Sequence, residues 1–210
     1  MLDRITQAAA AHHLAIFGTV TGADTPEGVR TLVLLGPLEP GFWPTFITSP
    51  EYKDAEPDPL DRWSLRVIDG LAHDLGATAF YPFGGPPYQP FIAWARASGR
   101  AHLSPVGLLV HDTAGLMISY RGALGFEQRI DAPPPPPNPC DTCASQPCVA
   151  ACPVDAFSGG HYDVPACKAD LDRPGNDCIS RGCAVRRACP VSQSYARLET
   201  QSAFHMRAFK

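Results

Sequence analysis

Eight cysteines are the residues of this 210-residue chain whose type and spacing could do chemistry, and all of them follow Pro139. They form two blocks, each ending in Cys-Pro-Val: Cys140, Cys143, Cys148 and Cys152, then Cys167, Cys178, Cys183 and Cys189. Clustered cysteines closed by Cys-x3-Cys-Pro are typical of bacterial ferredoxins that carry two clusters. Eight thiolates are the ligands that two [4Fe–4S] clusters require.

Zinc and disulfides are the two other uses of such cysteines. Four-cysteine zinc sites also contain Cys-x2-Cys, but the Cys-Pro ending occurs twice here, and the first block packs four cysteines into 13 residues. That block is too compact for one zinc ribbon. A disulfide framework requires an exported protein. The first 17 residues lack the basic region and cleavage site of a signal peptide, so the sequence favours iron–sulfur clusters.

The cysteine before each proline is expected to bind the other block's cluster, as in two-cluster ferredoxins. One cluster would then be held by Cys140, Cys143, Cys148 and Cys189. The other would be held by Cys152, Cys167, Cys178 and Cys183. This assignment uses all eight thiolates and ties the two blocks together.

Charge and hydropathy exclude several partners. The net charge is −4 and only 18% of residues are charged, so no basic surface for nucleic acid is expected. No stretch approaches the roughly 20 apolar residues that span a bilayer, so we expect no membrane partner. Free clustered thiols indicate a reducing compartment, the cytoplasm, and an electron-carrying chain implies a redox partner protein.

A run of prolines divides the chain. Residues 131–139 read Asp-Ala-Pro-Pro-Pro-Pro-Pro-Asn-Pro, which favours an extended, semi-rigid spacer. We therefore predict a domain over residues 1–130, a linker over 131–139 and an iron–sulfur domain over 140–210.

The first domain alternates between helical and strand patterns, which predicts an α+β fold with its own core. Its clearest helix is 58–75, with Pro59 at the first helical position, an apolar stripe and Gly76 as the stop. The other predicted helices are 3–14 and 90–98, and the predicted strands are 14–20, 31–35, 78–81, 106–110 and 116–120. The last two strands are expected to pair around a turn at 111–115. Short helical turns are expected at 148–152 and 183–189.

The cysteine region resembles the ferredoxin part of epoxyqueuosine reductase and of the corrinoid reductive dehalogenases. The Tyr-x4-Cys segment of that group stands here as Tyr162 to Cys167. The first domain, chiefly over residues 80–124, is similar to the same superfamily, which includes the CblC proteins. The resemblance implies a nitroreductase-like first domain and a bacterial-ferredoxin-like second one. Spacing within the blocks is longer than in the family, and the acid-bearing segment of epoxyqueuosine reductase has no counterpart.

Two functions follow from these patterns. The first is an oxidoreductase in which the clusters feed electrons to a small-molecule substrate site in the first domain, where the resemblance implies cobalamin or a flavin. The alternative is a non-catalytic electron carrier or cofactor-binding protein. Arg181, Arg186 and Arg187 lie among the second-block cysteines. They either form solvated surface or place positive charge beside an anionic cluster.

Overall fold

A computed structural model describes all residues, 1–210. The chain divides into two compact units. The first comprises residues 1–100 and 119–136, and the second comprises residues 101–118 and 137–210. The second unit therefore combines the cysteine region with residues 101–118, which the sequence-based division groups with the first domain. Each unit mixes helices and strands or turns, and the strand pairs of both are antiparallel.

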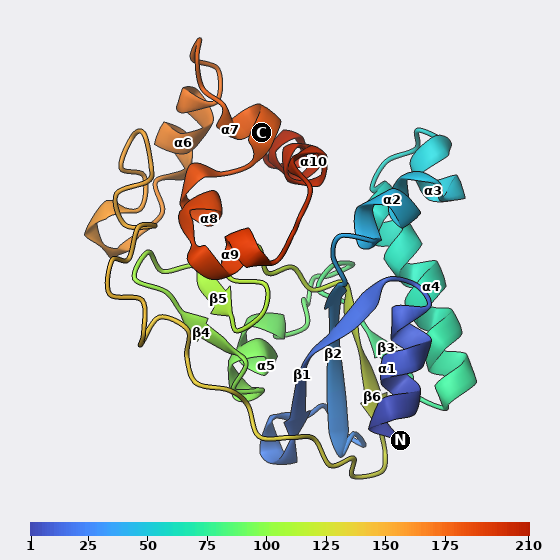
Figure 1. Cartoon of the computed structure of the whole chain (residues 1–210). Coiled ribbons are helices and arrows are strands. Elements are labelled where there is room, and N and C mark those ends of the chain that lie inside the picture. The colour runs from blue at the N-terminus through green and yellow to red at the C-terminus, as the bar shows by residue number, and fades with distance from the viewer. The chain divides into compact units, whose positions relative to one another are not determined.

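The first unit is built on a four-stranded sheet (Figure 1). Its strand order is β1-β2-β6-β3, and every neighbouring pair is antiparallel. The strands are β1 (Leu14–Thr21), β2 (Thr31–Pro37), β3 (Thr78–Phe80) and β6 (Gly122–Phe126). The helices are α1 (Leu2–Ala10), α2 (Phe42–Ile47), α3 (Pro50–Lys53), α4 (Pro59–Leu75) and α5 (Phe91–Ala97), with a short 3-10 turn, η1 (Gly22–Asp24).

Helices cover both faces of this sheet. Helices α1 and α4 lie together on one side (Figure 1). A Cβ added at Gly122 of β6 would meet Ile68 of α4, whereas one added at Gly18 of β1 would meet Ser98 at the end of α5. All seven residues of β2 are buried as a result. A strand buried on both faces reads as a continuous apolar run, as Leu32–Leu35 does.

Helix α4 confirms the most detailed local prediction. Pro59 begins it, and Gly76 ends it with φ of 65°, the left-handed conformation that glycine adopts at little cost. Asp58 lies at the N-cap but makes no side-chain capping bond. The predicted apolar stripe is buried throughout: Leu60, Trp63, Val67, Ile68, Leu71 and Leu75.

Other boundaries and elements differ from the sequence-based expectations. Helix α1 ends at Ala10, four residues earlier than predicted. Strand β6 and helices α2 and α3 were not predicted. Strand β6 reads Gly-Ala-Leu-Gly-Phe, and two glycines in five residues weaken any strand signal. The structure requires small residues there, since a Cβ at Gly125 would lie 2.7 Å from the Phe80 ring.

The second unit contains a small hairpin and a series of short helices. Strand β4 (Ala101–Leu103) pairs with β5 (Leu109–His111). The helices are α6 (Val164–Asp170), α7 (Cys178–Arg181), α8 (Ala184–Ala188), α9 (Pro190–Ser194) and α10 (Glu199–Phe209), with a 3-10 turn, η2 (Ser158–Gly160). Helix α8 agrees with the predicted turn at 183–189, whereas residues 148–152 form turns without a helix.

The predicted pairing of residues 106–110 with 116–120 is wrong. Residues 109–111 pair with 101–103 instead, and residues 116–120 form no strand. Side chains from the cysteine region form hydrogen bonds with the backbone N–H and C=O groups of this segment. Ser192 accepts a hydrogen bond from the Leu116 N–H at 2.8 Å, and Arg197 donates to the Met117 carbonyl at 2.8 Å. These bonds replace those of a strand ladder.

No helix in the structure has the length and apolar character needed to cross a lipid bilayer.

Candidate metal centre

All eight cysteines are free thiols, and they line two cavities of the second unit. Four cysteines lie on the wall of each cavity, and in each case one of the four comes from the other sequence block. The first set is Cys140, Cys143, Cys148 and Cys189. The second set is Cys152, Cys167, Cys178 and Cys183. This is the grouping that the crossover rule predicts.

The first cavity is open to solvent and has a volume of about 460 Å³. Its cysteines come from the loop that follows the proline segment and from the residue before α9. No charged residue lines it. The β4–β5 hairpin supplies part of its wall: Ser104, Pro105 and Val110.

The second cavity is tighter, with a volume of about 20 Å³. Helices α6 and α7 and the start of α8 position three of its cysteines, and Cys152 reaches it from the first block. Iron bonds to sulfur at distances well inside van der Waals contact, so a cluster needs less free volume than an unligated molecule of its size.

An apolar core joins the two cavities' walls. Val185 is fully buried and packs in one cluster with Val110, Leu116, Cys148 and Cys189. Val185 also lines the second cavity. Few other large side chains fill this unit, so its core consists largely of the residues around the thiols.

The thiols are held in surroundings that disfavour their charged form. Burial raises the pKa of Cys140, Cys148, Cys167 and Cys178 above the usual thiol value. Neighbouring thiols of the same cavity raise each of these pKa values further, as Cys189 does for Cys148. Four thiolates so placed repel one another unless a cation lies between them. A metal would release their protons and remove that repulsion.

Hydrogen-bond donors already point at several sulfur atoms. The Ala156 N–H donates to Cys152 Sγ at 3.2 Å, and the Tyr162 hydroxyl donates to Cys167 Sγ at 3.2 Å. The Ala184 backbone N–H also bonds Cys178 and lowers its pKa, against the larger effect of burial. Such donors stabilise negative charge on sulfur and tune the potential of a bound cluster.

The donor set fits a cluster of several metal atoms. The structure contains no group of three or more histidine, cysteine, aspartate or glutamate side chains placed to hold a metal ion. One zinc ion needs its thiolates about 3.8 Å apart, since four Zn–S bonds of about 2.3 Å meet at tetrahedral angles. A [4Fe–4S] cluster binds each cysteine through a different iron atom, so its ligands lie farther apart around a cavity.

The three second-block arginines have different surroundings. Arg181 pairs with Asp177 and Glu199, and Arg187 pairs with Asp177 at 2.6 Å. Arg186 is half-buried and donates to the Leu116 carbonyl. Burial lowers the pKa of Arg186, and the nearby Cys183 thiol opposes this by raising it. The charges of Arg186 and Arg187 therefore both act on candidate cluster ligands, on Cys183 and Cys178 respectively.

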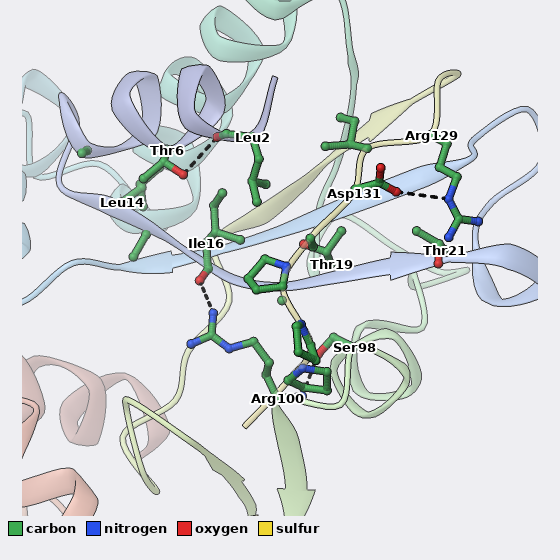
Figure 2. Close-up of a pocket in the computed structure, with 18 of the residues that line it drawn as sticks. Leu2, Thr6, Leu14, Ile16, Thr19, Thr21, Ser98, Arg100, Arg129 and Asp131 are labelled. Atoms are coloured by element: carbon green, nitrogen blue, oxygen red, sulfur yellow. Dashed lines mark hydrogen bonds and ion pairs between the residues drawn. The ribbon is translucent and has the colours of Figure 1, made fainter. Parts of the chain in front are cut away.

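The first unit has its own pocket, of about 550 Å³, shown in Figure 2. Helix α1, strand β1 and the segment from Arg129 to Pro135 form its walls. Three of its polar side chains are bonded within the protein. Arg100 donates to the Ile16 carbonyl at 2.9 Å, Thr6 to the Leu2 carbonyl at 3.0 Å, and Ser98 to the Ala95 carbonyl at 2.6 Å.

The polar groups of the pocket do not single out a corrinoid or a phosphate-bearing flavin. Its other arginine, Arg129, lies at the exposed rim and contacts Asp131 at 3.5 Å. No cysteine or histidine lines the pocket. The donor groups therefore do not select either cofactor.

Comparison with known proteins gave no match: no protein-family model, no curated protein and no solved structure is significantly similar to this chain.

Sequence reasoning missed the contribution of the hairpin to the candidate site. Ser104, Val110 and Leu116 line the first cavity although they lie at least 24 residues before Cys140. Their pattern resembles that of any buried strand, so nothing local marks them. The cysteine region has few apolar residues of its own and needs a segment from elsewhere in the chain to complete a core. That shortage is the signal that could have pointed to these residues.

Proposed function

We propose that this chain is a cytoplasmic iron–sulfur oxidoreductase whose second unit holds two [4Fe–4S] clusters, which would pass electrons to a site in the first unit. The observation that carries this proposal is the sorting of the eight cysteines into two cavities, four in each. Both sets contain one crossover cysteine, Cys189 in the first and Cys152 in the second. Eight thiols placed at random among the 74 residues from 137 to 210 would not be expected to form two sets of four with one crossover cysteine in each.

When bound, the clusters would accept and release single electrons. The chain's own residues hold them by eight thiolates and exclude water with an apolar wall that includes Val110, Leu116 and Val185. Backbone and hydroxyl donors stabilise negative charge on the sulfurs. The electron donor would be a redox partner protein that approaches the solvent-open first cavity.

The ferredoxin-like assignment of this unit rests on the Cys-Pro blocks and on the crossed cysteines. The nitroreductase-like assignment of the first unit rests on the resemblance over residues 80–124, of which residues 101–118 lie in the second unit. The antiparallel sheet with helices on both faces is compatible with it. As in the sequence analysis, this would make the chain a relative of the CblC-like superfamily.

An electron-carrier role without catalysis is the second candidate. It is favoured by the pocket of the first unit, where Thr6, Ser98 and Arg100 are bonded to backbone carbonyls. An enzyme of the suggested superfamily would present polar groups to a cofactor and a substrate there. In the carrier, the first unit serves as a docking platform.

Electron uptake tests the proposal. The protein, purified and reconstituted anaerobically with iron and sulfide, should take up about two electrons per chain from a low-potential reductant, one per cluster. Its reduced form should give a paramagnetic spectrum with contributions from two clusters. If circular dichroism shows that the protein is folded but it takes up no electrons, the proposal is contradicted.

Colour separates the two candidates. A carrier incubated with a corrinoid or a flavin, then desalted, should retain only the broad brown absorbance of its clusters. Retention of about one corrinoid or flavin per chain would favour the oxidoreductase instead. Arg100→Ala, which removes the hydrogen bond to the Ile16 carbonyl in the pocket wall, is the matched control for retention in this pocket.

A further inference from the structure

A side-chain hydroxyl lies beside each set of four cysteines. Tyr162 donates to Cys167 Sγ at 3.2 Å in the second cavity's cysteine set. Ser104 lines the first cavity, where Cys140, Cys143 and Cys189 lie. Thr142 and Ser145 also line the first cavity but are exposed, whereas Ser104 is buried.

Ser104 is a buried polar group with no protein partner for its side chain. The residue is 7% exposed, and its Oγ makes no hydrogen bond. Its backbone is fixed in the turn of the β4–β5 hairpin. The Ser104 N–H donates to the Leu108 carbonyl at 2.9 Å, and the Gly107 N–H donates to the Ser104 carbonyl at 2.9 Å. Leaving such a hydroxyl unpaired is unfavourable, so its partner is expected to be whatever occupies the cavity.

Tyr162 is held in place by two other aromatic rings. Its ring stacks on Phe157 with centroids 4.4 Å apart and planes 7° from parallel. The Phe209 ring stacks on the Tyr162 ring, with centroids 6.1 Å apart and planes 16° from parallel. The stack fixes the direction of the hydroxyl, and replacement by phenylalanine would keep the stack.

We propose that the Ser104 and Tyr162 hydroxyls each donate a hydrogen bond to sulfur at one cluster and raise the reduction potential of that cluster alone. This rests on the proposed function. Reduction adds one electron, and the sulfur atoms carry part of the added negative charge. A hydroxyl donor stabilises the reduced form more than the oxidised form, so the potential rises. Because the two hydroxyls serve different cavities, they set the two potentials independently.

Single substitutions followed by redox titration test the proposal. Ser104→Ala should shift the midpoint of one cluster to a more negative potential and leave the other unchanged. Tyr162→Phe should shift the other cluster in the same direction. The paramagnetic spectrum at each applied potential identifies which cluster responds, since Cys189→Ser and Cys152→Ser perturb the first and second signals respectively.

Matched controls carry the same chemical changes away from the sulfurs. Ser194→Ala removes an exposed hydroxyl that donates to the Pro190 carbonyl at 3.3 Å, and Tyr88→Phe removes one from a 66% exposed side chain. Neither should move a midpoint. If Ser104→Ala does not assemble its cluster, Ser104→Thr retains the hydroxyl and should keep the wild-type potential.

Two failures are distinguishable. If wild type and variants all lack iron and sulfide, the proposed function fails. If all hold two clusters but Ser104→Ala and Tyr162→Phe leave both midpoints unchanged, the clusters stand and the role of the two hydroxyls is wrong. A shift of both midpoints by one variant would also overturn it, because that would indicate a general structural change.

Discussion

The residues that decide the chemistry are the two cysteines that precede proline. Cys152 and Cys189 each line the cavity formed mainly by the other block. Proline follows each of them and has no N–H to continue a local hydrogen-bonded turn. The chain therefore leaves the block at these points, and the two candidate sites become dependent on each other.

We expect Cys152→Ser to damage the cluster held by Cys167, Cys178 and Cys183 more than the other one. Cys189→Ser should have the opposite effect. Oxygen is a poorer ligand than thiolate for these iron atoms, so the affected cluster should be lost or its signal shifted. Paramagnetic spectra of the reduced variants provide the measurement. If Cys152→Ser and Cys148→Ser perturb the same signal, each block forms a closed site and the crossover is wrong.

At the scale of elements, helix α4 holds the first unit together. Its apolar stripe faces strand β6, where Gly122 leaves room for the Ile68 side chain. Helix α3 joins it through an ion pair between Glu51 and Arg66, with Nη2 and Oε2 at 3.0 Å. Each contact predicts a separate effect on stability.

We expect Ile68→Ala to lower the free energy of unfolding of the first unit by about 2–5 kcal/mol, because Ile68 is fully buried. Leu65→Ala on the same helix is the control. Leu65 is 39% exposed, so its loss should cost about 0.5 kcal/mol or less. Urea unfolding followed by circular dichroism measures both. Equal losses in the two variants would contradict the buried-face assignment.

The Glu51–Arg66 pair predicts an acid-dependent stability. The hydrogen bond from Arg66 holds the pKa of Glu51 below its usual range, so the pair stabilises the fold above about pH 4.3. That contribution is lost as the pH falls through the lowered pKa. Glu51→Gln should therefore cost about 0.5–1 kcal/mol at pH 7, a modest value because half of the Arg66 side chain is exposed.

Unfolding of wild type and Glu51→Gln at several pH values between 7 and 3 gives the measurement. The difference between them should shrink as the pH approaches 3. Glu56→Gln, which alters an exposed carboxyl group in the same region, should show no such difference. A Glu51→Gln effect of the same size at pH 7 and pH 3 would mean that the lost charge is not its cause.

Sequence patterns predicted the elements that follow one periodicity and missed those that depend on distant residues. Helix α4 and strands β1 and β2 carry their own caps and apolar runs, so they were predicted with near-correct boundaries. Strand β6 was missed because its glycines leave room for side chains that lie more than 40 residues away in the sequence, such as Ile68 and Phe80. The segment 116–120 was assigned to a strand, but Ser192, Arg186 and Arg197 bind its backbone.

The candidate site shows the same division. The cysteine spacing predicts which residues are candidate ligands and how they group around the two cavities, because iron–sulfur sites are marked by short, fixed spacings between cysteines. The cavity wall could not be predicted in the same way. Ser104 lies in a hairpin turn that looks ordinary in the sequence, and only the fold brings it to the thiols.

At the scale of the whole molecule, the two units should respond differently to loss of metal. The first has a conventional apolar core around β2. The second has short helices and a core built around its thiols. When a site forms only in the folded state, the binding free energy of its metal contributes to folding.

We therefore expect removal of iron under anaerobic conditions to unfold the second unit selectively. Hydrogen exchange should show backbone amides of α8 and α10 becoming fast, while those of β2 and β6 remain protected. Returning iron and sulfide should restore protection. Loss of protection in β2 at the same rate as in α8 would contradict the independence of the two units.

The most direct test of the central claim is the metal and sulfide content of the chain. Protein isolated and handled without oxygen should contain about eight irons and eight acid-labile sulfides per chain, two clusters of four each. The variant with serine at all of Cys140, Cys143, Cys148 and Cys189 should retain at most about half of both. A wild-type content of two zinc ions with no labile sulfide would contradict the account.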